Sequence, residues 1–262
     1  MLVEINIFGL HLRTFGLAFA AAFLAAGALI ARRLQEIGKP REWAYEIVGA
    51  ALIGGVVGSR AYFIVQNGTS GGFDQTAFSA TGLIWYGGVV GGAAAVLLWA
   101  WYRRFLGLAL LDLIAPALAL GYAVGRIGCQ LTGDGTYGKP SSLPWAMGYP
   151  HGVLPTPPGV HVQPTPVYET LVMGLIALWL WRHRDAYRPG VLFASYLILS
   201  GTERLLIEFI RRNSHVLLGL TAAQIESLAM IVVGSLWLAL LRRSGSLRHR
   251  TTSPQSEPLP TT

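Results

Sequence analysis

The stretch LGLALLDLIAPALALGYAVGRIG, residues 106–128, indicates a membrane-spanning helix. An α-helix rises about 1.5 Å per residue, so about 20 apolar residues cross the roughly 30 Å of hydrocarbon in a bilayer. The run continues directly into CQLTGDGTYGKP, residues 129–140, which is polar and rich in glycine. Arg126 lies near the end of the apolar run. Because a charge at that depth is costly, Arg126 is a functional candidate.

The rest of the chain has the same apolar character. Of its 262 residues, 53% are hydrophobic and 13% are charged, whereas soluble domains carry about 25% charged residues. We therefore expect an all-α, polytopic membrane protein with seven transmembrane helices. The predicted helices cover residues 15–31, 45–66, 82–102, 106–128, 167–181, 190–210 and 216–241.

The cysteine, histidine and glycine patterns indicate which covalent links, metal sites and helix contacts the chain can form. One cysteine excludes an intrachain disulfide, and the six histidines show no metal-ligand spacing, so we expect no metal and no cofactor. Glycine pairs at four-residue spacing suit close contact between membrane helices. These pairs are Gly54/Gly58, Gly87/Gly91 and Gly88/Gly92.

Basic residues alternate between the predicted loops. Lys and Arg follow the first, third, fifth and seventh apolar segments and are sparse in the other loops, where Arg211 and Arg212 are the one discordant pair. The positive-inside rule then places the N-terminus outside and the C-terminus in the cytoplasm. The net charge of +7 is therefore a topology signal, and we expect no nucleic-acid partner.

The domain organisation follows from this topology. Residues 1–243 are expected to form one membrane domain, with residues 129–166 as a long extracytoplasmic loop between helices four and five. A loop of this length in a compact fold is usually functional or disordered. Residues 244–262, which end in SPQSEPLPTT, have the composition of a disordered cytoplasmic tail.

Three arginines fall at or inside apolar segments: Arg60, Arg126 and Arg204. A guanidinium is always charged and can fork onto a phosphate, so arginines that face one cavity would form a phosphate-headgroup site. The alternatives are an ion pair of Arg204 with a nearby glutamate, or snorkelling of Arg60 to the interface. We also expect Arg126 to head a glycine-rich turn whose backbone N–H groups cradle an anion.

A family resemblance rests on a signature and seven further pieces in order. GRIGCQLTGDGTYG, residues 125–138, resembles the signature of the bacterial prolipoprotein diacylglyceryl transferases. The resemblance extends from residue 8 to about residue 241. Its other pieces are the Phe15-Gly16 pair, residues 58–63, WYGGVVGG at 85–92, Asp112 with Pro116, QPTPVYE at 163–169, residues 204–209 and residues 218–224.

The resemblance implies a reaction and a cellular location. Members of this family transfer the diacylglyceryl group of phosphatidylglycerol to the thiol of a lipobox cysteine in prolipoproteins, and glycerol 1-phosphate leaves. The expected partners are phosphatidylglycerol, the prolipoprotein cysteine and membrane lipids, and the expected location is the bacterial plasma membrane.

The resemblance also implies a set of site residues. It assigns catalytic roles to Arg126, Arg204, Tyr86 and Asp134. It assigns substrate binding to Arg60, Phe15, Gly87, Gly88, Gly125, Gly128, Cys129, Thr132, Gly138, Tyr168, Glu169, Tyr196 and Ser200.

Several positions depart from the family pattern. Tyr86 stands where the family has histidine, and Asp134 stands where it has glutamate. Asparagines become Cys129 and Thr132, and tyrosines become Phe15 and Ser200. The phosphate-binding arginines are kept, whereas groups that move protons or donate hydrogen bonds are changed.

These departures leave two alternatives open. One is a paralogue that transfers from phosphatidylglycerol to another acceptor, and the other is a non-catalytic membrane protein that binds anionic lipid. Tyr196, one helical turn before Ser200, is a candidate to restore a lost hydroxyl. We interpret Cys129 as a small apolar filler instead of a nucleophile.

Overall fold

A computed structural model describes residues 2–7, 10–67, 85–217 and 219–247 of the chain. Within these ranges the fold is almost entirely helical. The helices are α1 (Thr14–Glu36), α2 (Trp43–Asn67), α4 (Trp85–Tyr102), α5 (Leu108–Thr132), α6 (Thr165–Arg182), α7 (Val191–Glu208) and α8 (Ala222–Arg243). Two antiparallel hairpins join them, β1 (Glu4–Ile7) with β2 (Leu10–Arg13) and β3 (His215–Leu217) with β4 (Leu220–Thr221).

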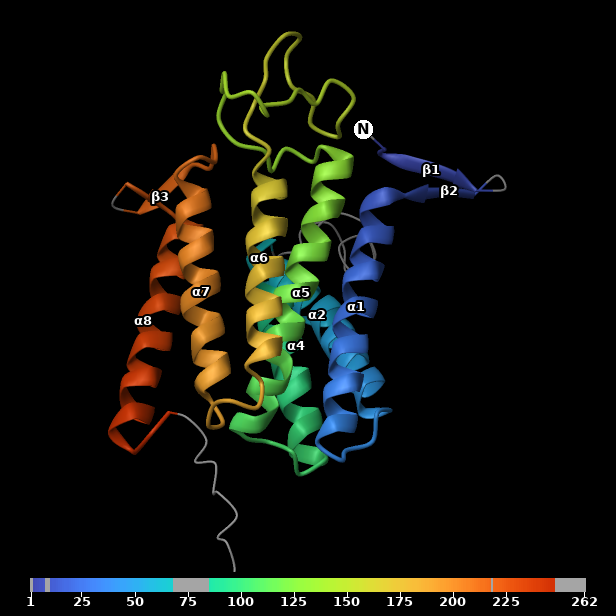
Figure 1. Ribbon diagram of the computed structural model, residues 1–262. Helices are drawn as coiled ribbons and strands as arrows, with labels where there is room; N and C mark the ends of the chain where they lie inside the picture. Colours follow the sequence, from blue (N-terminus) through green and yellow to red (C-terminus); the bar gives the residue numbers. More distant parts are fainter. Residues whose placement is uncertain (1, 8–9, 68–84, 218, 248–262) are drawn as a thin grey trace, which may run out of the picture.

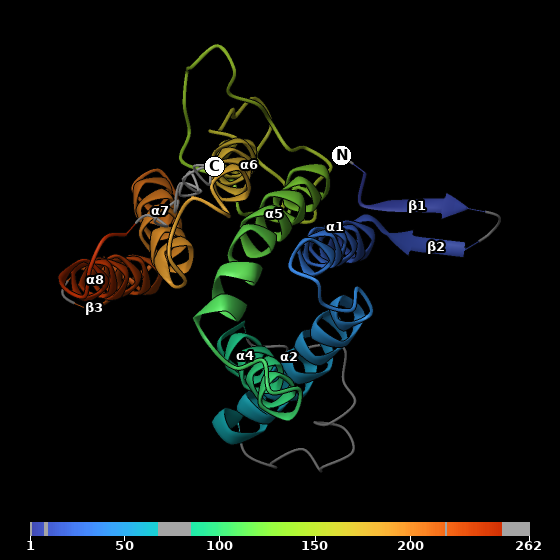
Figure 2. The same cartoon turned by 60° about the horizontal axis from the view of Figure 1, so that its bottom comes forward.

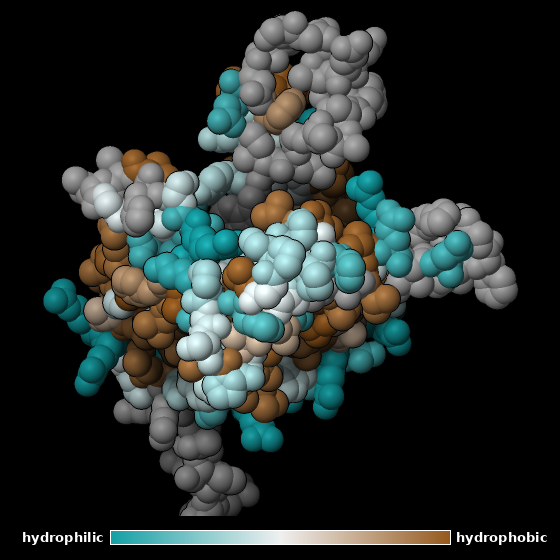
Figure 3. Space-filling model, turned by 90° about the horizontal axis from the view of Figure 1, so that it is seen from above, coloured by the Kyte–Doolittle hydropathy of each residue, from teal (hydrophilic) through white to brown (hydrophobic). Residues whose placement is uncertain are grey.

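The helices run alternately up and down, which gives the molecule two distinct ends (Figure 1). The long-loop end carries both hairpins and the connection 133–164 between α5 and α6. The short-loop end carries the turns that connect α1 to α2, α4 to α5, and α6 to α7. Seen from the long-loop end, hydrophilic residues gather over the middle of the bundle and hydrophobic residues surround them (Figure 3).

Helix α5 holds two groups of helices together (Figure 2). It packs against α1 on one side and against α6 and α7 on the other. Helices α1, α2 and α4 share an apolar core that includes Leu34, Ala100 and Leu113. A second core between α5, α6 and α7 includes Met173 and Leu180. The residues of α5 therefore contribute to both cores.

Glycines bring α2 and α4 into backbone contact, as their spacing predicted. A Cβ on Gly87 would overlap the carbonyl oxygen of Gly58, and a Cβ on Gly91 would overlap that of Gly54. Small residues allow such an approach because no side chain separates the two backbones. Gly87 is therefore explained by helix packing in this structure.

Polar contacts join neighbouring helices at the short-loop end. Arg33 at the end of α1 pairs with Asp185 at 2.7 Å, and Arg184 pairs with Glu36 at 2.7 Å. The Asp112 carboxylate of α5 accepts hydrogen bonds from the backbone N–H groups of Gly190, at 2.7 Å, and of Phe193, at 2.8 Å. Asp112 thus caps the N-terminus of a neighbouring helix, α7, and its negative charge suits that position.

The structure confirms a helical protein with membrane character. By length and composition, four helices among the described residues are apolar enough to cross a membrane: Thr14–Glu36, Trp43–Gln66, Leu108–Thr132 and Ala222–Arg243. Helix α7 carries Glu203, Arg204 and Glu208, and it is not one of these four. Seven transmembrane helices therefore stay a prediction.

Three predicted boundaries differ from the structure. Helix α5 continues to Thr132 and ends at Gly133 in the left-handed conformation, so the long connection is 133–164 and not 129–166. Residues 216–217 and 219–221, predicted as part of the start of the last helix, belong to the β3–β4 hairpin, in which Gly219 has a φ of 75°. Residues 4–7 and 10–13 form the strands β1 and β2, which the all-α prediction did not include.

Two predictions fall partly outside the described residues. These are the start of the third apolar segment, at 82–84, and most of the predicted tail, at 248–262. Residues 244–247 are described, and Arg188 donates its backbone N–H to the carbonyl oxygen of Leu247 at 2.9 Å.

Candidate active site

Three arginines converge on one buried carboxylate at the long-loop end. Glu169, near the start of α6, has no solvent exposure. Arg126 of α5 lies 2.8 Å from Oε2, Arg204 of α7 lies 3.2 Å from Oε1, and Arg211, just after α7, lies 3.3 Å from Oε1. We call Glu169, Arg126, Arg204 and Arg211 the Glu169 cluster. It joins segments that are more than 80 residues apart in the sequence.

Neighbouring polar groups orient the arginines of the cluster. Arg126 donates to the Tyr122 hydroxyl at 2.9 Å, and its guanidinium lies 4.8 Å from the centre of that ring. Arg204 also pairs with Glu208 at 3.4 Å. The other oxygen of Glu208 accepts hydrogen bonds from Thr221 at 2.7 Å and from Asn213 at 2.6 Å. The cluster is thereby connected to the start of α8.

The electrostatics of the cluster favour an anionic ligand. Burying a single carboxylate is costly unless partners compensate it, and Glu169 has three cationic partners. One carboxylate neutralises one guanidinium, and Glu208 neutralises a second. The side chains of Arg126 and Arg204 keep 16% and 22% of their surface exposed. Their remaining donors are therefore available to an anion such as a phosphate.

The predicted turn at Arg126 is corrected by the structure. Arg126 lies inside α5, six residues before its end at Thr132. Helical backbone N–H groups bond to carbonyl oxygens of the preceding turn, so they do not cradle an anion there. The turn begins at Gly133, where Asp134 accepts hydrogen bonds from the backbone and the hydroxyl of Thr136, at 3.1 and 2.7 Å.

Several other predicted residues lie close to Arg126. The Cys129 thiol is buried, 3.8 Å from Nη1 of Arg126, and it also interacts with Asp134. The Thr132 hydroxyl donates to the carbonyl oxygen of Gly128 at 2.8 Å, which uses it within the helix. A Cβ on Gly125 would meet no heavy atom within 4 Å, so α5 has open space beside Arg126.

The predicted residues on α6 and α7, and Gly138 of the long connection, differ in the groups that they contact. Tyr196 has Tyr122 and Glu203 among its electrostatic neighbours. The Ser200 hydroxyl is satisfied within α7, because it donates to the carbonyl oxygen of Tyr196 at 2.6 Å. Tyr168 accepts a hydrogen bond from Trp145 of the long connection at 2.5 Å. A Cβ on Gly138 would lie 2.8 Å from the carbonyl oxygen of Ile210, so this glycine allows close packing.

The structure does not bring the remaining predicted residues into contact with Glu169. Tyr86, in the first turn of α4, is hydrogen-bonded to Glu226 of α8, with Arg204 as an electrostatic neighbour. Arg60 of α2 lies over the Phe63 ring, 5.8 Å from its centre. Phe15 of α1 is 47% exposed and lies near Gly128. Gly88 faces α2, beside Gly55.

Sequence reasoning missed two members of the site. Arg211 belongs to the cluster, and Arg212 stacks over Tyr137 at 5.0 Å from the ring centre. These two arginines were the discordant pair in the charge pattern, so the discordance itself was the available signal. Tyr122 precedes Arg126 by four residues, which puts both on the same face of a helix.

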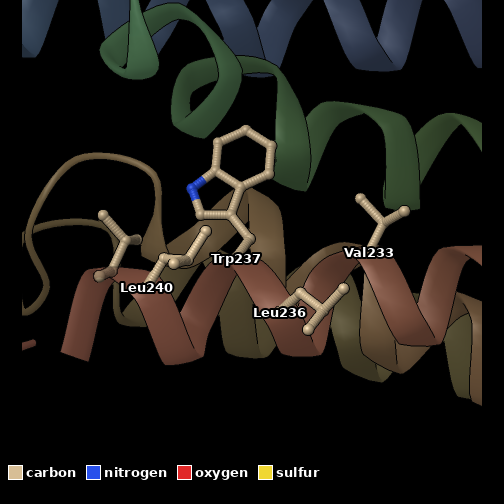
Figure 4. A pocket seen from close by; sticks show the side chains of 5 residues that line it. Val233, Leu236, Trp237 and Leu240 are labelled. Atoms are coloured by element: carbon tan, nitrogen blue, oxygen red, sulfur yellow. The ribbon is translucent and has the colours of Figure 1, made fainter. Parts of the chain in front are cut away.

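Two surface pockets lie away from the Glu169 cluster. Val233, Leu236, Trp237 and Leu240 line an apolar pocket on the half of α8 nearer the short-loop end (Figure 4). Another is lined by residues 101–106, also at the short-loop end. Neither contains a predicted site residue, and the Glu169 cluster stays the candidate active site.

Fold and site together define a class: a helical membrane protein with a buried arginine cluster at one end of the bundle. The chain belongs to the prolipoprotein diacylglyceryl transferase family, whose model matches residues 2–240. The resemblance seen in the sequence is thereby confirmed.

Relatives from distant bacteria match most of the chain. A protein of Clostridium tetani is 30% identical over 237 residues, which cover 88% of this chain and 94% of that protein. A protein of Synechococcus elongatus is 31% identical and covers 93% of this chain and 88% of its own length. One from Rhodospirillum centenum is 30% identical and covers 94% and 93%. All three are named phosphatidylglycerol–prolipoprotein diacylglyceryl transferase.

Proposed function

We propose that this protein transfers the diacylglyceryl group of phosphatidylglycerol to the cysteine thiol of prolipoproteins. Family membership and the names of relatives that match nearly the whole chain support this activity. The observation that carries it within the molecule is the Glu169 cluster. Arg126 and Arg204 converge there, and each keeps part of its side chain exposed.

The reaction requires charge stabilisation at the leaving phosphate. A carbon–sulfur bond forms at the terminal glyceryl carbon, and the bond from that carbon to the phosphate oxygen breaks. The electron pair stays on the phosphate, which gains one negative charge. Fixed cations stabilise such developing charge, and each well-placed donor contributes about 10²–10³-fold in rate. We assign this role to Arg126 and Arg204.

The other site residues then have supporting roles in the proposal. Glu169 and Tyr122 hold the arginines in place through contacts of 2.8 to 3.2 Å. Tyr86 joins the start of α4 to Glu226 of α8, and Asp134 shapes the turn where the acceptor peptide arrives. Open space beside Gly125 receives part of the lipid.

We further propose that the protein lies in the bacterial inner membrane with seven spans, the N-terminus outside and the C-terminus in the cytoplasm. The charge distribution supports this orientation. Basic residues at the ends of α1 and α8, and in the turns after α4 and α6, all lie at the short-loop end. The Glu169 cluster then faces the outer leaflet, which is where a lipobox cysteine emerges.

The test is transfer with purified components. The protein in phosphatidylglycerol micelles is incubated with a lipobox peptide, and glycerol phosphate release is measured beside thioether formation on the peptide. We expect release that requires the peptide and is lost in Arg126→Ala. Arg184→Ala, at the short-loop end, is the matched control and retains release. Lipid binding without release by the wild-type protein would contradict the transferase and favour the non-catalytic lipid binder.

A further inference from the structure

Glu203 is a buried carboxylate beside the Glu169 cluster that the proposed mechanism does not yet use. It precedes Arg204 on α7 and is 5% exposed. Its Oε1 is buried and has no hydrogen-bond partner among the described residues. An unpartnered buried carboxylate is costly in any protein, and more so at membrane depth. Such a group calls for a functional explanation.

The surroundings of Glu203 place it with the reacting groups. Its electrostatic neighbours come from every element of the cluster. They are Tyr122 and Arg126 of α5, Glu169 of α6, Tyr196 and Arg204 of α7, and Arg211. Glu203 thus interacts electrostatically with the arginines that we assign to the leaving phosphate, without an ion pair to any of them.

The nearby candidates for a proton acceptor are already engaged. Glu169 is ion-paired to three arginines, and Glu208 is bound by Arg204, Thr221 and Asn213. Tyr86, which stands at the position of the family histidine, is hydrogen-bonded to Glu226. Of the carboxylates around the cluster in the described part of the chain, Glu203 alone has neither an ion-pair nor a hydrogen-bond partner.

Resting on the proposed function, we propose that Glu203 is the general base that takes the proton from the acceptor thiol. The thiol proton passes to a Glu203 oxygen as sulfur attacks the glyceryl carbon. The carbon–oxygen bond to the phosphate breaks, and the electron pair goes to the phosphate. The proton leaves afterwards with the glycerol phosphate, which restores the carboxylate.

The charge balance of this step suits the site. With Glu203 ionised, the three arginines are balanced by Glu169, Glu203 and Glu208. Protonation of Glu203 raises the charge of the site by one at the moment when the leaving phosphate gains one negative charge. The step therefore moves negative charge from the carboxylate to the phosphate without changing the total, and the arginines are already oriented to receive it.

The test compares Glu203→Gln with wild type at several pH values. General base catalysis contributes about 10²–10⁴-fold, so we expect the variant to lose about that factor in kcat/KM at neutral pH. Free thiols ionise near pH 8.5, so the deficit shrinks as the pH rises to 9. Thr202→Ala, on the exposed face of the same helix turn, is the matched control with unchanged rates.

A second substrate separates base catalysis from a structural role. A lipobox peptide with selenocysteine carries a nucleophile that is ionised at neutral pH and needs no base. This peptide should restore most of the rate of Glu203→Gln but not that of Arg126→Ala. Binding of phosphatidylglycerol vesicles and thermal unfolding of Glu203→Gln show whether the site is intact.

Each outcome decides between the two proposals. An active wild type with Glu203→Gln within threefold of it at every pH would overturn the role of Glu203 and leave the transferase intact. A folded variant with a pH-independent deficit that selenocysteine does not relieve would also overturn it. If Glu203→Gln does not fold, Glu203→Asp shortens the reach of the carboxylate by one methylene, and the proposal then requires a smaller deficit that the selenocysteine peptide relieves. An inactive wild type would refute the proposed function itself.

Discussion

The two ends of the bundle both carry arginines paired with carboxylates, but their environments differ. At the short-loop end, Arg33 and Arg184 pair with Glu36 and Asp185, whose side chains are 26% and 68% exposed. At the long-loop end, three arginines share Glu169, which is not exposed at all. The first arrangement joins α1 to the turn after α6. The second keeps charge where burial penalises it.

The exposed ion pairs of the short-loop end join neighbouring helices, whereas the buried cluster of the long-loop end has the features of a binding site. Exposed ion pairs contribute about 0–1 kcal/mol because water screens them and their side chains lose entropy. A buried carboxylate is tolerated only with excellent partners, and removing one partner leaves an uncompensated charge. The convergence of three arginines on one buried carboxylate has no evident structural purpose at the long-loop end. It becomes intelligible when an anion from the membrane completes the cluster.

The largest effect is expected from Glu169→Ala. The change leaves Arg126, Arg204 and Arg211 close together without their common counterion. We expect a loss of about 3–5 kcal/mol in the free energy of unfolding, together with loss of transfer activity. Unfolding of the purified protein in detergent measures this directly. A variant as stable as wild type would show that the arginines do not depend on Glu169.

A smaller effect, confined to the reaction, is expected from Arg204→Lys. Arg204 contacts Glu169 at 3.2 Å and Glu208 at 3.4 Å, and a lysine ammonium cannot fork between two carboxylates and a phosphate. We expect about a 10²–10³-fold fall in kcat for glycerol phosphate release, with the fold retained. Arg184→Lys at the opposite end should keep the wild-type rate. Equal rates for Arg204→Lys and Arg184→Lys would show that the arginines of the two ends do not differ in their contribution to the reaction.

Asp112→Ala removes a carboxylate that caps a neighbouring helix, in contrast to the exposed carboxylates of the short-loop end and the buried Glu169. Asp112 has no arginine in contact and binds the backbone N–H groups of Gly190 and Phe193. Loss of a helix cap costs about 0.5–2 kcal/mol, so the thermal midpoint should fall modestly while kcat stays near wild type. Circular dichroism melts and the release assay measure the two quantities. A large loss of kcat would place Asp112 in the reaction after all.

The smallest effect is expected from Glu36→Gln. The change removes the partner of Arg184 and weakens contacts of Arg33 at the water-exposed short-loop end. We expect a change of about 0–1 kcal/mol in unfolding free energy, reduced further by added salt. Unfolding at low and high salt tests this. A loss as large as that of Glu169→Ala would mean that the two ends do not differ in kind.

Much of the fold was readable from the sequence because apolar length and glycine spacing are local signals. The segments 45–66 and 167–181 lie within one or two residues of α2 and α6 at each end. The hairpins escaped prediction because a short strand pair has few residues and no membrane-length pattern. The end of α5 was misplaced because its glycines suggested a turn, although glycines within a helix also allow close contact, as Gly128 does against Ala18.

The site was predicted in part. Arg126, Arg204 and Glu169 were named and do meet. Arg211 escaped because a residue just after a helix looks like a loop charge, and burial cannot be read from its neighbours in sequence. Glu203 was considered only as an ion-pair partner of Arg204. Its isolation results from the packing of α5, α6 and α7 around it, which is a property of the assembled bundle.

The glycine contact between α2 and α4 also has a mechanical consequence. No side chains separate the two backbones at Gly58 and Gly87, so no rotamer change can loosen them. Helices α2 and α4 therefore move together as one rigid unit when the bundle flexes. Tyr86, in the first turn of α4, moves with this unit, and its hydroxyl is hydrogen-bonded to Glu226 of α8, which lies outside it. Any sideways displacement of α2 is thus transmitted to α8 through one phenol.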